Sequence, residues 1–148
     1  MKILRTDSSN AAFQQLVAQL DAELSVIDGE EHAFYAQFNK ITLIKHVIVV
    51  MENEAPVGCG AIKEFDPVSM EVKRMYVPPA LRGKGIAAIV LQELEKWAKE
   101  LNYTRCVLET GERLPAAIAL YKKAGYHIIP NYGQYIGVEN SVCFEKTL

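Results

Sequence analysis

Long apolar runs are missing from this chain. The longest, Val47 to Met51 and Ile86 to Leu91, are far shorter than the roughly 20 residues that a membrane-spanning helix needs. The first residues also contain no apolar stretch long enough for a signal peptide. We therefore expect a cytoplasmic protein with no membrane partner.

Cysteine is scarce as well. The three cysteines, Cys59, Cys106 and Cys143, lie far apart and form no Cys-x-x-Cys pair. Such an odd, scattered set argues against a disulfide framework and against a structural zinc site. The three histidines are equally dispersed. We expect buried free thiols, which pack as small apolar residues, and no metal.

The chain also has no strong excess of either charge. Its net charge is -2, and the charged residues are spread along the sequence. Nucleic-acid binding depends on clustered Lys and Arg that neutralise phosphates, so no nucleic-acid partner is expected. No Gly/Ser-rich or proline-rich linker divides the 148 residues. We expect a single domain over residues 1–148, long enough to bury a substantial core.

Hydrophobic periodicity divides the first half of the chain into helical and extended parts. Residues 2–6 are typical of a short strand, and apolar residues at helical spacing follow from Phe13 to Leu24. A second helix is expected over residues 30–38. Residues 46–77 favour three strands joined by short turns, which predicts an antiparallel meander. Gly58 and Gly60 in the middle strand indicate a bulge or a close backbone approach.

The second half alternates between the two patterns. A helix is predicted from residue 86 to about 101, a strand over 105–110, and a helix that begins at Pro115 and ends before Gly125. Two strands, near 126–130 and 141–146, follow. The order β-α-α-β-β-β-α-β-α-β-β, with one β-α-β crossover in the middle, predicts a mixed α/β (α+β) fold with three layers.

The segment Arg82-Gly83-Lys84-Gly85-Ile86-Ala87 lies between a predicted strand and a predicted helix. The first N–H groups of a helix lack internal partners, and the positive end of the helix dipole lies behind them. Two glycines leave room for an anion to reach these amides, and the two basic residues add positive charge. The pattern therefore predicts a phosphate or pyrophosphate site.

Two other interpretations of this segment stay open from the residues alone. It could be a flexible turn with solvated basic residues. It also fits the dinucleotide pattern G-x-G-x-x-A, with Glu109 ending the next strand. Its place in mid-chain and the short remaining sequence count against a dinucleotide fold, and a Walker-type loop is excluded because no G-x-x-x-x-G-K-[ST] occurs.

The stretch 71–77 followed by this loop resembles motif A of the GCN5-related N-acetyltransferases (GNAT). That motif reads R/Q-x-x-G-x-G/A, and Arg82, Gly85 and Ala87 match it. Residues 108–110 and 117–126 resemble motif B, whose core is A-x-x-L-Y-x-x-x-G-F/Y. The likeness extends from about residue 46 to the end, and both motifs occur in order. The chain is identified as a member of this family, of the small bacterial type.

The resemblance implies the acyl-CoA N-acyltransferase fold, a central and mostly antiparallel, splayed sheet of about seven strands with helices on both faces. It implies acetyl-CoA as co-substrate. The amides of 82–87 would hold the pyrophosphate, and a strand edge would pair with the pantetheine arm. The implied cofactor-binding residues are Met75, Tyr76, Val77, Arg82, Gly83, Lys84, Gly85, Ile86, Ala87, Ala117 and Tyr121.

The implied chemistry is direct attack by an amine within a ternary complex. An ammonium has no lone pair, so a base or a desolvating pocket must remove its proton. Glu71 matches the position of the base in histone-acetylating members, but it could instead be an ion-pair partner of Lys73. Glu64 and a water chain are alternatives. Tyr121 matches the tyrosine that protonates the departing thiolate, although such an aromatic residue could also serve packing alone.

The resemblance leaves the acceptor open. Many members carry an Asn that contacts pantetheine seven residues before the tyrosine, where this chain has Leu114. Candidate residues lining the acceptor site are His32, Tyr35, His127, Tyr132 and Tyr135. The acceptor is expected to be a primary amine of a small molecule or peptide, and a homodimer is compatible with the family. A non-catalytic acyl-CoA sensor is the alternative function.

Overall fold

The computed structural model describes residues 1–28 and 43–148. The helix expected over 30–38, together with His32 and Tyr35, lies outside the described residues. The strands are β1 (Lys2–Thr6), β2 (His46–Glu52), β3 (Ala55–Asp66), β4 (Ser69–Tyr76), β5 (Arg105–Gly111), β6 (His127–Ile129) and β7 (Ser141–Thr147). The helices are α1 (Ala11–Asp28), α3 (Ile86–Glu100) and α4 (Pro115–Lys123), with 3₁₀ turns η2 (Pro79–Leu81) and η3 (Gly133–Tyr135).

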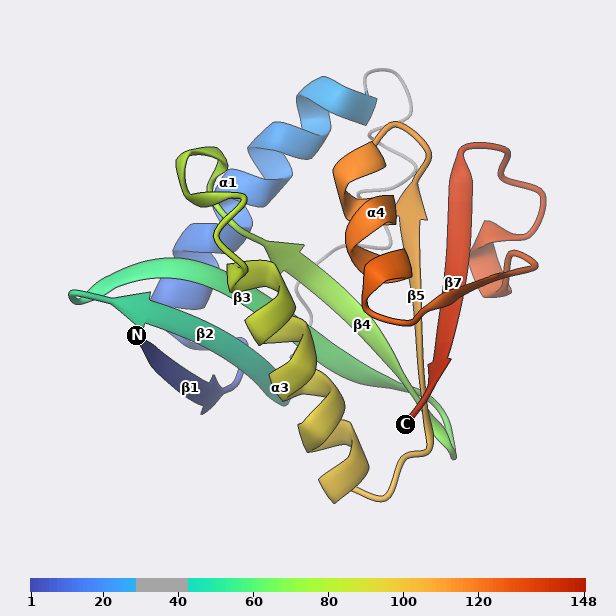
Figure 1. The fold of residues 1–148 in the computed structure, drawn as a ribbon, viewed down its shortest axis with the longest axis horizontal. Helices are drawn as coiled ribbons and strands as arrows, with labels where there is room; N and C mark the ends of the chain where they lie inside the picture. Colours follow the sequence, from blue (N-terminus) through green and yellow to red (C-terminus); the bar gives the residue numbers. More distant parts are fainter. Residues whose placement is uncertain (29–42) are drawn as a thin grey trace.

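All seven strands form one sheet in the order β1-β2-β3-β4-β5-β7-β6 (Figure 1). Every neighbouring pair is antiparallel except β4 and β5, which are parallel and joined through α3. A parallel pair needs a crossover connection, and α3 supplies it. The predicted antiparallel meander and the single β-α-β crossover are therefore confirmed.

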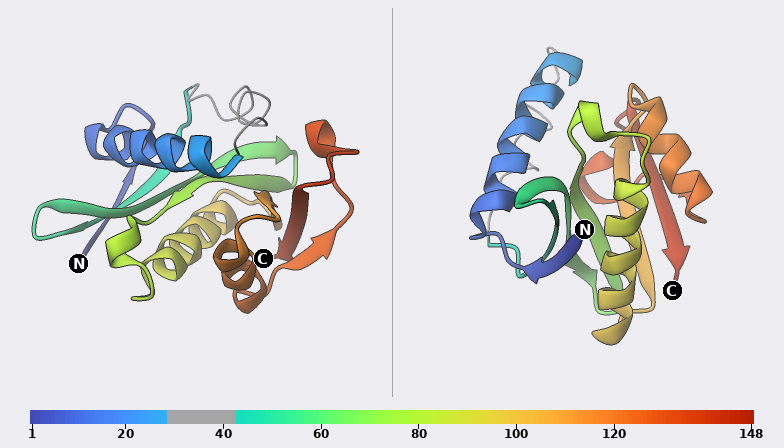
Figure 2. Two further views of the ribbon diagram at one scale, coloured as in Figure 1. Left: turned by 90° about the horizontal axis from the view of Figure 1, so that it is seen from above. Right: turned by 60° about the vertical axis from the view of Figure 1, so that its left-hand side comes forward.

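Helices cover both faces of the sheet, which makes the three predicted layers (Figure 2). On one face, α1 packs Phe13, Leu16 and Val17 against β2 and β3. Its first turn is capped by Asn10, whose Oδ1 accepts a hydrogen bond from the Phe13 N–H at 3.0 Å. On the other face, α3 and α4 pack against the sheet and enclose the larger of the two main hydrophobic cores. The buried side of α3 comprises Ile86, Val90, Leu91, Leu94 and Ala98.

The two glycines of β3 mark a close approach between the sheet and α3. A methyl group added at Gly60 would lie 2.5 Å from Met75 Sδ and 2.8 Å from Val90 Cγ1, and one added at Gly58 would lie 2.6 Å from Ile86 Cγ2. Such distances are shorter than van der Waals contact, so α3 can sit this deep only because both positions lack a side chain. The predicted close approach is confirmed at this point.

The parallel pairing of β4 with β5 is short. It joins Ser69 to Arg105 and Glu71 to Val107, and beyond this point the two strands diverge (Figure 1). The carboxyl half of β4 therefore presents a strand edge that β5 does not cover. The sheet is splayed at this position, as the family resemblance implied.

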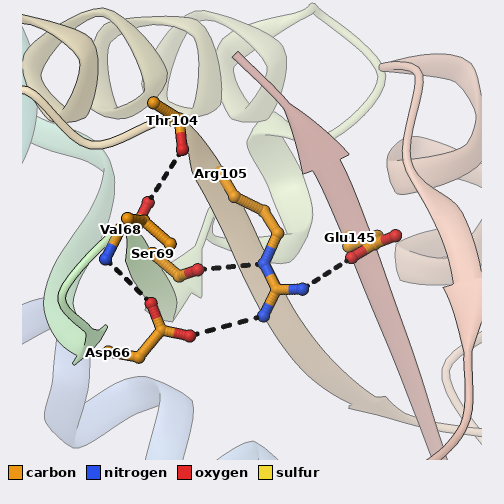
Figure 3. Close-up of polar contacts among 6 residues, drawn as sticks. All are labelled: Asp66, Val68, Ser69, Thr104, Arg105 and Glu145. Atoms are coloured by element: carbon orange, nitrogen blue, oxygen red, sulfur yellow. Dashed lines mark hydrogen bonds and ion pairs between the residues drawn. The ribbon is translucent and has the colours of Figure 1, made fainter.

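Polar side chains hold the paired end of this seam together (Figure 3). The guanidinium of Arg105 donates from Nε to Ser69 Oγ at 2.9 Å and from Nη1 to Glu145 Oε2 at 2.9 Å, and its Nη2 lies 3.7 Å from Asp66 Oδ2. The other oxygen of Asp66 accepts the Val68 N–H. Arg105 thus links the β3–β4 turn, the start of β5 and the end of β7.

All three cysteines are buried. Burial raises the pKa of the Cys59 and Cys106 thiols to about 12, which keeps them protonated and unreactive at neutral pH. Within residues 1–28 and 43–148, no helix is long and apolar enough to cross a membrane. Among these same residues, no three His, Cys, Asp or Glu side chains are grouped as metal ligands.

Candidate active site

A cleft of about 150 Å³ opens where β4 and β5 separate. Residues from five elements line it: β4, β5, α4, α1 and the 3₁₀ turn η3. The lining is mixed, with carboxylates, a phenol, basic groups and leucine side chains around the same space. The lining residues are Leu20, Leu24, Glu71, Val72, Lys73, Arg74, Met75, Glu109, Thr110, Gly111, Leu114, Ala117, Tyr121 and Tyr135.

A β-bulge shapes the β4 wall of this cleft. Cys59 pairs with Tyr76 and Ala61 with Lys73, so β4 carries one more residue than β3 between these pairs. Arg74 in the bulge has a φ of 58°, a left-handed conformation that is uncommon for a residue other than glycine. Its buried guanidinium donates to Asp21 Oδ1 on α1 at 2.7 Å. This ion pair ties the bulge to α1.

The glycine loop at the start of α3 is open to solvent. Gly83 and Gly85 have φ angles of 81° and 82°, and a methyl group added at either would meet no atom within 4 Å. Gly85 is the N-cap of α3 and no side chain caps the helix there. The first amides of α3 thus have no side-chain partner at the cap, as an anion site requires.

The two basic residues of the loop behave differently. Lys84 is exposed. Arg82 folds back: its Nε donates to the Val77 carbonyl at 2.8 Å, and its Nη2 contacts both carboxylate oxygens of Glu23 on α1, at 3.0 and 2.7 Å. Its guanidinium also lies 5.7 Å from the centre of the Tyr76 ring. These contacts connect the loop to Val77 and to α1, and the predicted role of Arg82 in adding charge at a phosphate site stays a prediction.

The other residues of the predicted donor site differ in whether their side chains line the cleft or pack in a core. Met75 and Ala117 line the cleft directly. The side chains of Tyr76, Val77 and Ile86 pack in the two cores and, unlike that of Tyr121, do not line the cleft, so the predicted role of these three falls to their backbone groups. Ala87 packs partly against the larger core.

Glu71 projects into the cleft from β4. Its Oε2 accepts a hydrogen bond from the Tyr132 hydroxyl at 2.7 Å, and its Oε1 lies 3.6 Å from Lys73 Nζ. Tyr132 comes from the segment between β6 and β7, and its ring also packs edge-on against Phe65. Both roles weighed for Glu71 are thus compatible with its position, since it faces the cleft and is also paired with Lys73.

Tyr121 reaches the cleft from the inner side of α4. Its side chain is buried, with the ring near those of Tyr126 and Phe144. Burial, with a smaller contribution from the Glu109 carboxylate, raises the pKa of the Tyr121 phenol well above its usual value of 10.0. The phenol is therefore protonated at neutral pH and has a proton to donate.

Glu109 is a cleft residue to which the sequence analysis gave no catalytic role. It lies on β5 opposite Cys143 of β7, and its Oε2 accepts a hydrogen bond from Ser141 Oγ at 2.6 Å. The alternation along β5 could have revealed it, because Cys106 and Leu108 face the larger core and Glu109 must then point away from it. Leu114, in place of the expected Asn, is the N-cap of α4 and lines the cleft.

Two residues that the sequence offered as site candidates, Glu64 and His127, lie outside the cleft lining. Glu64 is not among the residues that line the cleft: it shares a face of β3 with Ile62, which packs in the α3 core, and its carboxylate accepts the Tyr103 hydroxyl. His127 is exposed on the edge strand β6 and is also not part of the lining. Tyr135 lines the cleft and Tyr132 contacts it through Glu71.

Comparisons with known proteins agree with this architecture. The Acetyltransferase (GNAT) family matches residues 13–126. An IAA acetyltransferase of Azospirillum brasilense is 32% identical over 150 residues, which cover 99% of this chain and 97% of that protein. A Klebsiella pneumoniae protein assigned to the acyl-CoA N-acyltransferases has 30% identity and a TM-score of 0.82, over 99% of this chain and 97% of its own.

A third similarity concerns the fold. A PaiA N-acetyltransferase of Thermoplasma acidophilum, crystallised in complex with coenzyme A, has a TM-score of 0.73 at 17% identity, over 100% of both chains. A doubly wound dinucleotide fold would instead require a mostly parallel sheet, so that alternative is wrong. With a family match over most of its length and relatives aligned almost from end to end, the chain belongs to the GNAT family of acetyltransferases.

Proposed function

We propose that this enzyme transfers the acetyl group of acetyl-CoA to a primary amine of a small molecule or peptide, inside the cleft between β4 and β5. The observation that carries the proposal is that an open helix start without a side-chain cap, at Gly83 and Gly85, closely follows in the chain a strand edge that β5 leaves uncovered. The loop amides of 82–87 would bind the pyrophosphate of the donor. The edge of β4 from Met75 to Val77 would pair with the amides of the pantetheine arm.

The thioester would then lie beside the bulge of β4. A main-chain N–H near Met75 would polarise the carbonyl and stabilise the oxyanion that forms when the amine attacks. The burial of Val72, Arg74 and Tyr121 in the lining supports this, because a hydrogen bond to an oxyanion is stronger where less water is present.

Proton transfer would involve one group on each side of the cleft. The attacking amine must be neutral, and an alkylammonium with a pKa of about 10.4 is mostly charged at pH 7. Glu71 on β4 would accept its proton, directly or through water. Tyr121 on α4, which burial keeps protonated, would supply a proton or a hydrogen bond to the departing thiolate of coenzyme A.

The alternative role as an acyl-CoA sensor predicts binding without turnover. The test is to measure acetyl-CoA binding by calorimetry and thiol release with a panel of amines that includes amino acids, polyamines, aminoglycosides and peptide N-termini. Amine-dependent thiol release that Tyr121→Phe greatly reduces would support the enzyme. Binding of acetyl-CoA by both proteins, with no thiol release by either for any amine, would favour the sensor. The single domain, the cytoplasmic location and the homodimer stay predictions.

A further inference from the structure

Lys73 lies in the cleft, and the transfer scheme above gives it no part. It follows Glu71 by two residues on β4, so both side chains project from the same face of the strand. Its Nζ is 3.6 Å from Glu71 Oε1, and its side chain is only 14% exposed. Met75 and Tyr121 line the same cleft. A primary alkyl amine of the protein itself is thus held beside the proposed base, in the space that would receive the thioester.

We propose that Lys73 is an intramolecular acetyl acceptor, so that the protein acetylates its own Lys73 from acetyl-CoA when no amine substrate is present. The proposal rests on the proposed function, because it uses the same donor site, the same base and the same acid. Lys73 differs from an external amine in that it is already positioned and needs no binding step, which favours reaction even for a weak nucleophile.

The reaction balances without any further reactant. The ammonium of Lys73 first loses one proton, through Glu71 to solvent, and its nitrogen lone pair then attacks the thioester carbonyl carbon. The C–N bond forms, the nitrogen gives a second proton to Glu71, and the C–S bond breaks as the sulfur takes the Tyr121 proton. Glu71 passes the second proton back to Tyr121 through water. The products are Nε-acetyl-Lys73, coenzyme A and one proton released to solvent.

Acetylation would change the cleft in two ways. It removes the positive charge that faces Glu71, and with it their ion pair. It also places an acetyl group in the space where the external amine must approach the thioester. The modified enzyme would therefore acetylate amines more slowly. In the absence of an acceptor amine, acetyl-CoA would thus inactivate the enzyme that consumes it.

Lys63 provides a matched control. It pairs with Glu71 across β3 and β4, so it projects from the same face of the sheet as Lys73. It is exposed, however, and is not among the residues that line the cleft. Uncatalysed acetylation by acetyl-CoA favours the exposed amine of Lys63, whereas the proposed reaction favours the less exposed amine of Lys73.

The experiment incubates the full chain with acetyl-CoA alone and follows each lysine by peptide mass spectrometry. We expect Lys73 to gain one acetyl group at least about tenfold faster than Lys63, with a first-order rate constant that is independent of protein concentration. Tyr121→Phe should slow the Lys73 reaction by about tenfold or more and leave the Lys63 reaction unchanged. Acetylation of Lys73 no faster than of Lys63, insensitivity to Tyr121→Phe, or a fraction acetylated per unit time that rises with protein concentration would overturn the proposal.

A second variant covers the effect on activity. Wild-type enzyme incubated with acetyl-CoA and then given an amine from the panel should lose most of its initial rate, whereas Lys73→Arg, which keeps the charge, should retain its own initial rate after the same treatment. Equal losses in both proteins would contradict the proposal. If panel amines are acetylated and Lys73 is not, only this inference fails; if calorimetry detects no acetyl-CoA binding, the proposed function fails with it.

Discussion

The two ends of the seam between β4 and β5 differ in how their polar groups are used. At the paired end, Arg105 from β5 donates hydrogen bonds to Ser69 on β4 and to Glu145 on β7, and it forms an ion pair with Asp66 at the end of β3. At the open end, Glu71 is held by Tyr132 and Lys73, and Glu109 by Ser141. Charges at the first end hold the strands together, whereas those at the second end line a space between them.

This difference shows how one sheet can provide both a stable base and a reaction site. The bulge at Arg74 lies at the open end, where β4 leaves the regular ladder. Changes at the open end should therefore affect binding and turnover, and changes at the paired end should affect stability. The following predictions test that separation, beginning with the largest effect.

Tyr121→Phe should lower amine-dependent turnover by about 100-fold or more, because the departing thiolate loses its proton donor. Affinity for coenzyme A should change little, since the ring remains. Steady-state thiol release and calorimetry measure the two quantities. Tyr126→Phe is the control: it also loses a buried hydroxyl, which bonds to Glu95 outside the cleft, and it should keep its turnover. A fully active Tyr121→Phe enzyme would remove this residue from the mechanism.

Gly85→Val should weaken the binding of coenzyme A by about tenfold or more, because a branched side chain disfavours a φ of 82° and occupies the open space over the helix start. Calorimetric titration gives the affinity. Gly137→Val is matched, since Gly137 has a φ of 80° and equally open surroundings but lies between β6 and β7. Equal binding by both variants would contradict the assignment of the loop.

Arg105→Leu should reduce the free energy of unfolding by about 1–2 kcal/mol, because buried Ser69 and two carboxylates lose a donor. Urea unfolding measures this loss. Arg105→Lys should recover part of it, while coenzyme A affinity should be the same in all three proteins. A large drop in affinity with unchanged stability would reverse the roles given to the two ends.

The smallest expected effect concerns pH. Hydrogen bonds from the Val68 N–H and from Ser69, together with the charge of Arg105, hold the pKa of Asp66 below its usual value of 3.8. A carboxyl group whose pKa is lower in the folded state than in the unfolded state stabilises the protein at pH values above the unfolded-state pKa. This stabilisation is lost as the pH falls through the folded-state pKa. The difference in unfolding midpoint between wild type and Asp66→Asn should therefore narrow on acidification from pH 6. A constant difference would argue against a role for the Asp66 charge.

Much of the fold was predictable because its determinants are local. The β-branched run 47–50, the helical spacing of Ile86, Val90 and Leu94, and the Pro115 and Gly125 boundaries each specify an element with little help from distant residues. The open loop at Gly83 and Gly85 was likewise predictable, since two glycines leave no side chains to close it.

The rest depended on tertiary contacts that have no sequence signal. Nothing in the sequence marks Arg74 for a left-handed bulge, because that conformation is usually taken by Gly or Asn. The fold-back of Arg82 requires Glu23, which is 59 positions earlier in the chain. The sequence offered Glu64 as an alternative to Glu71, and only the structure shows that Glu71 lines the cleft and Glu64 does not. The roles of the cleft residues stay predictions.

The close packing of α3 against Gly58 and Gly60 of β3 has a practical consequence for engineering. Neither Gly58 nor Gly60 is among the residues that line the cleft, yet any side chain there would push against α3, whose first turn is the proposed donor site. A mutant library built to broaden amine preference should therefore keep both codons fixed. Diversity is better placed at Leu20, Leu24 and Tyr135, which border the cleft without supporting the helix.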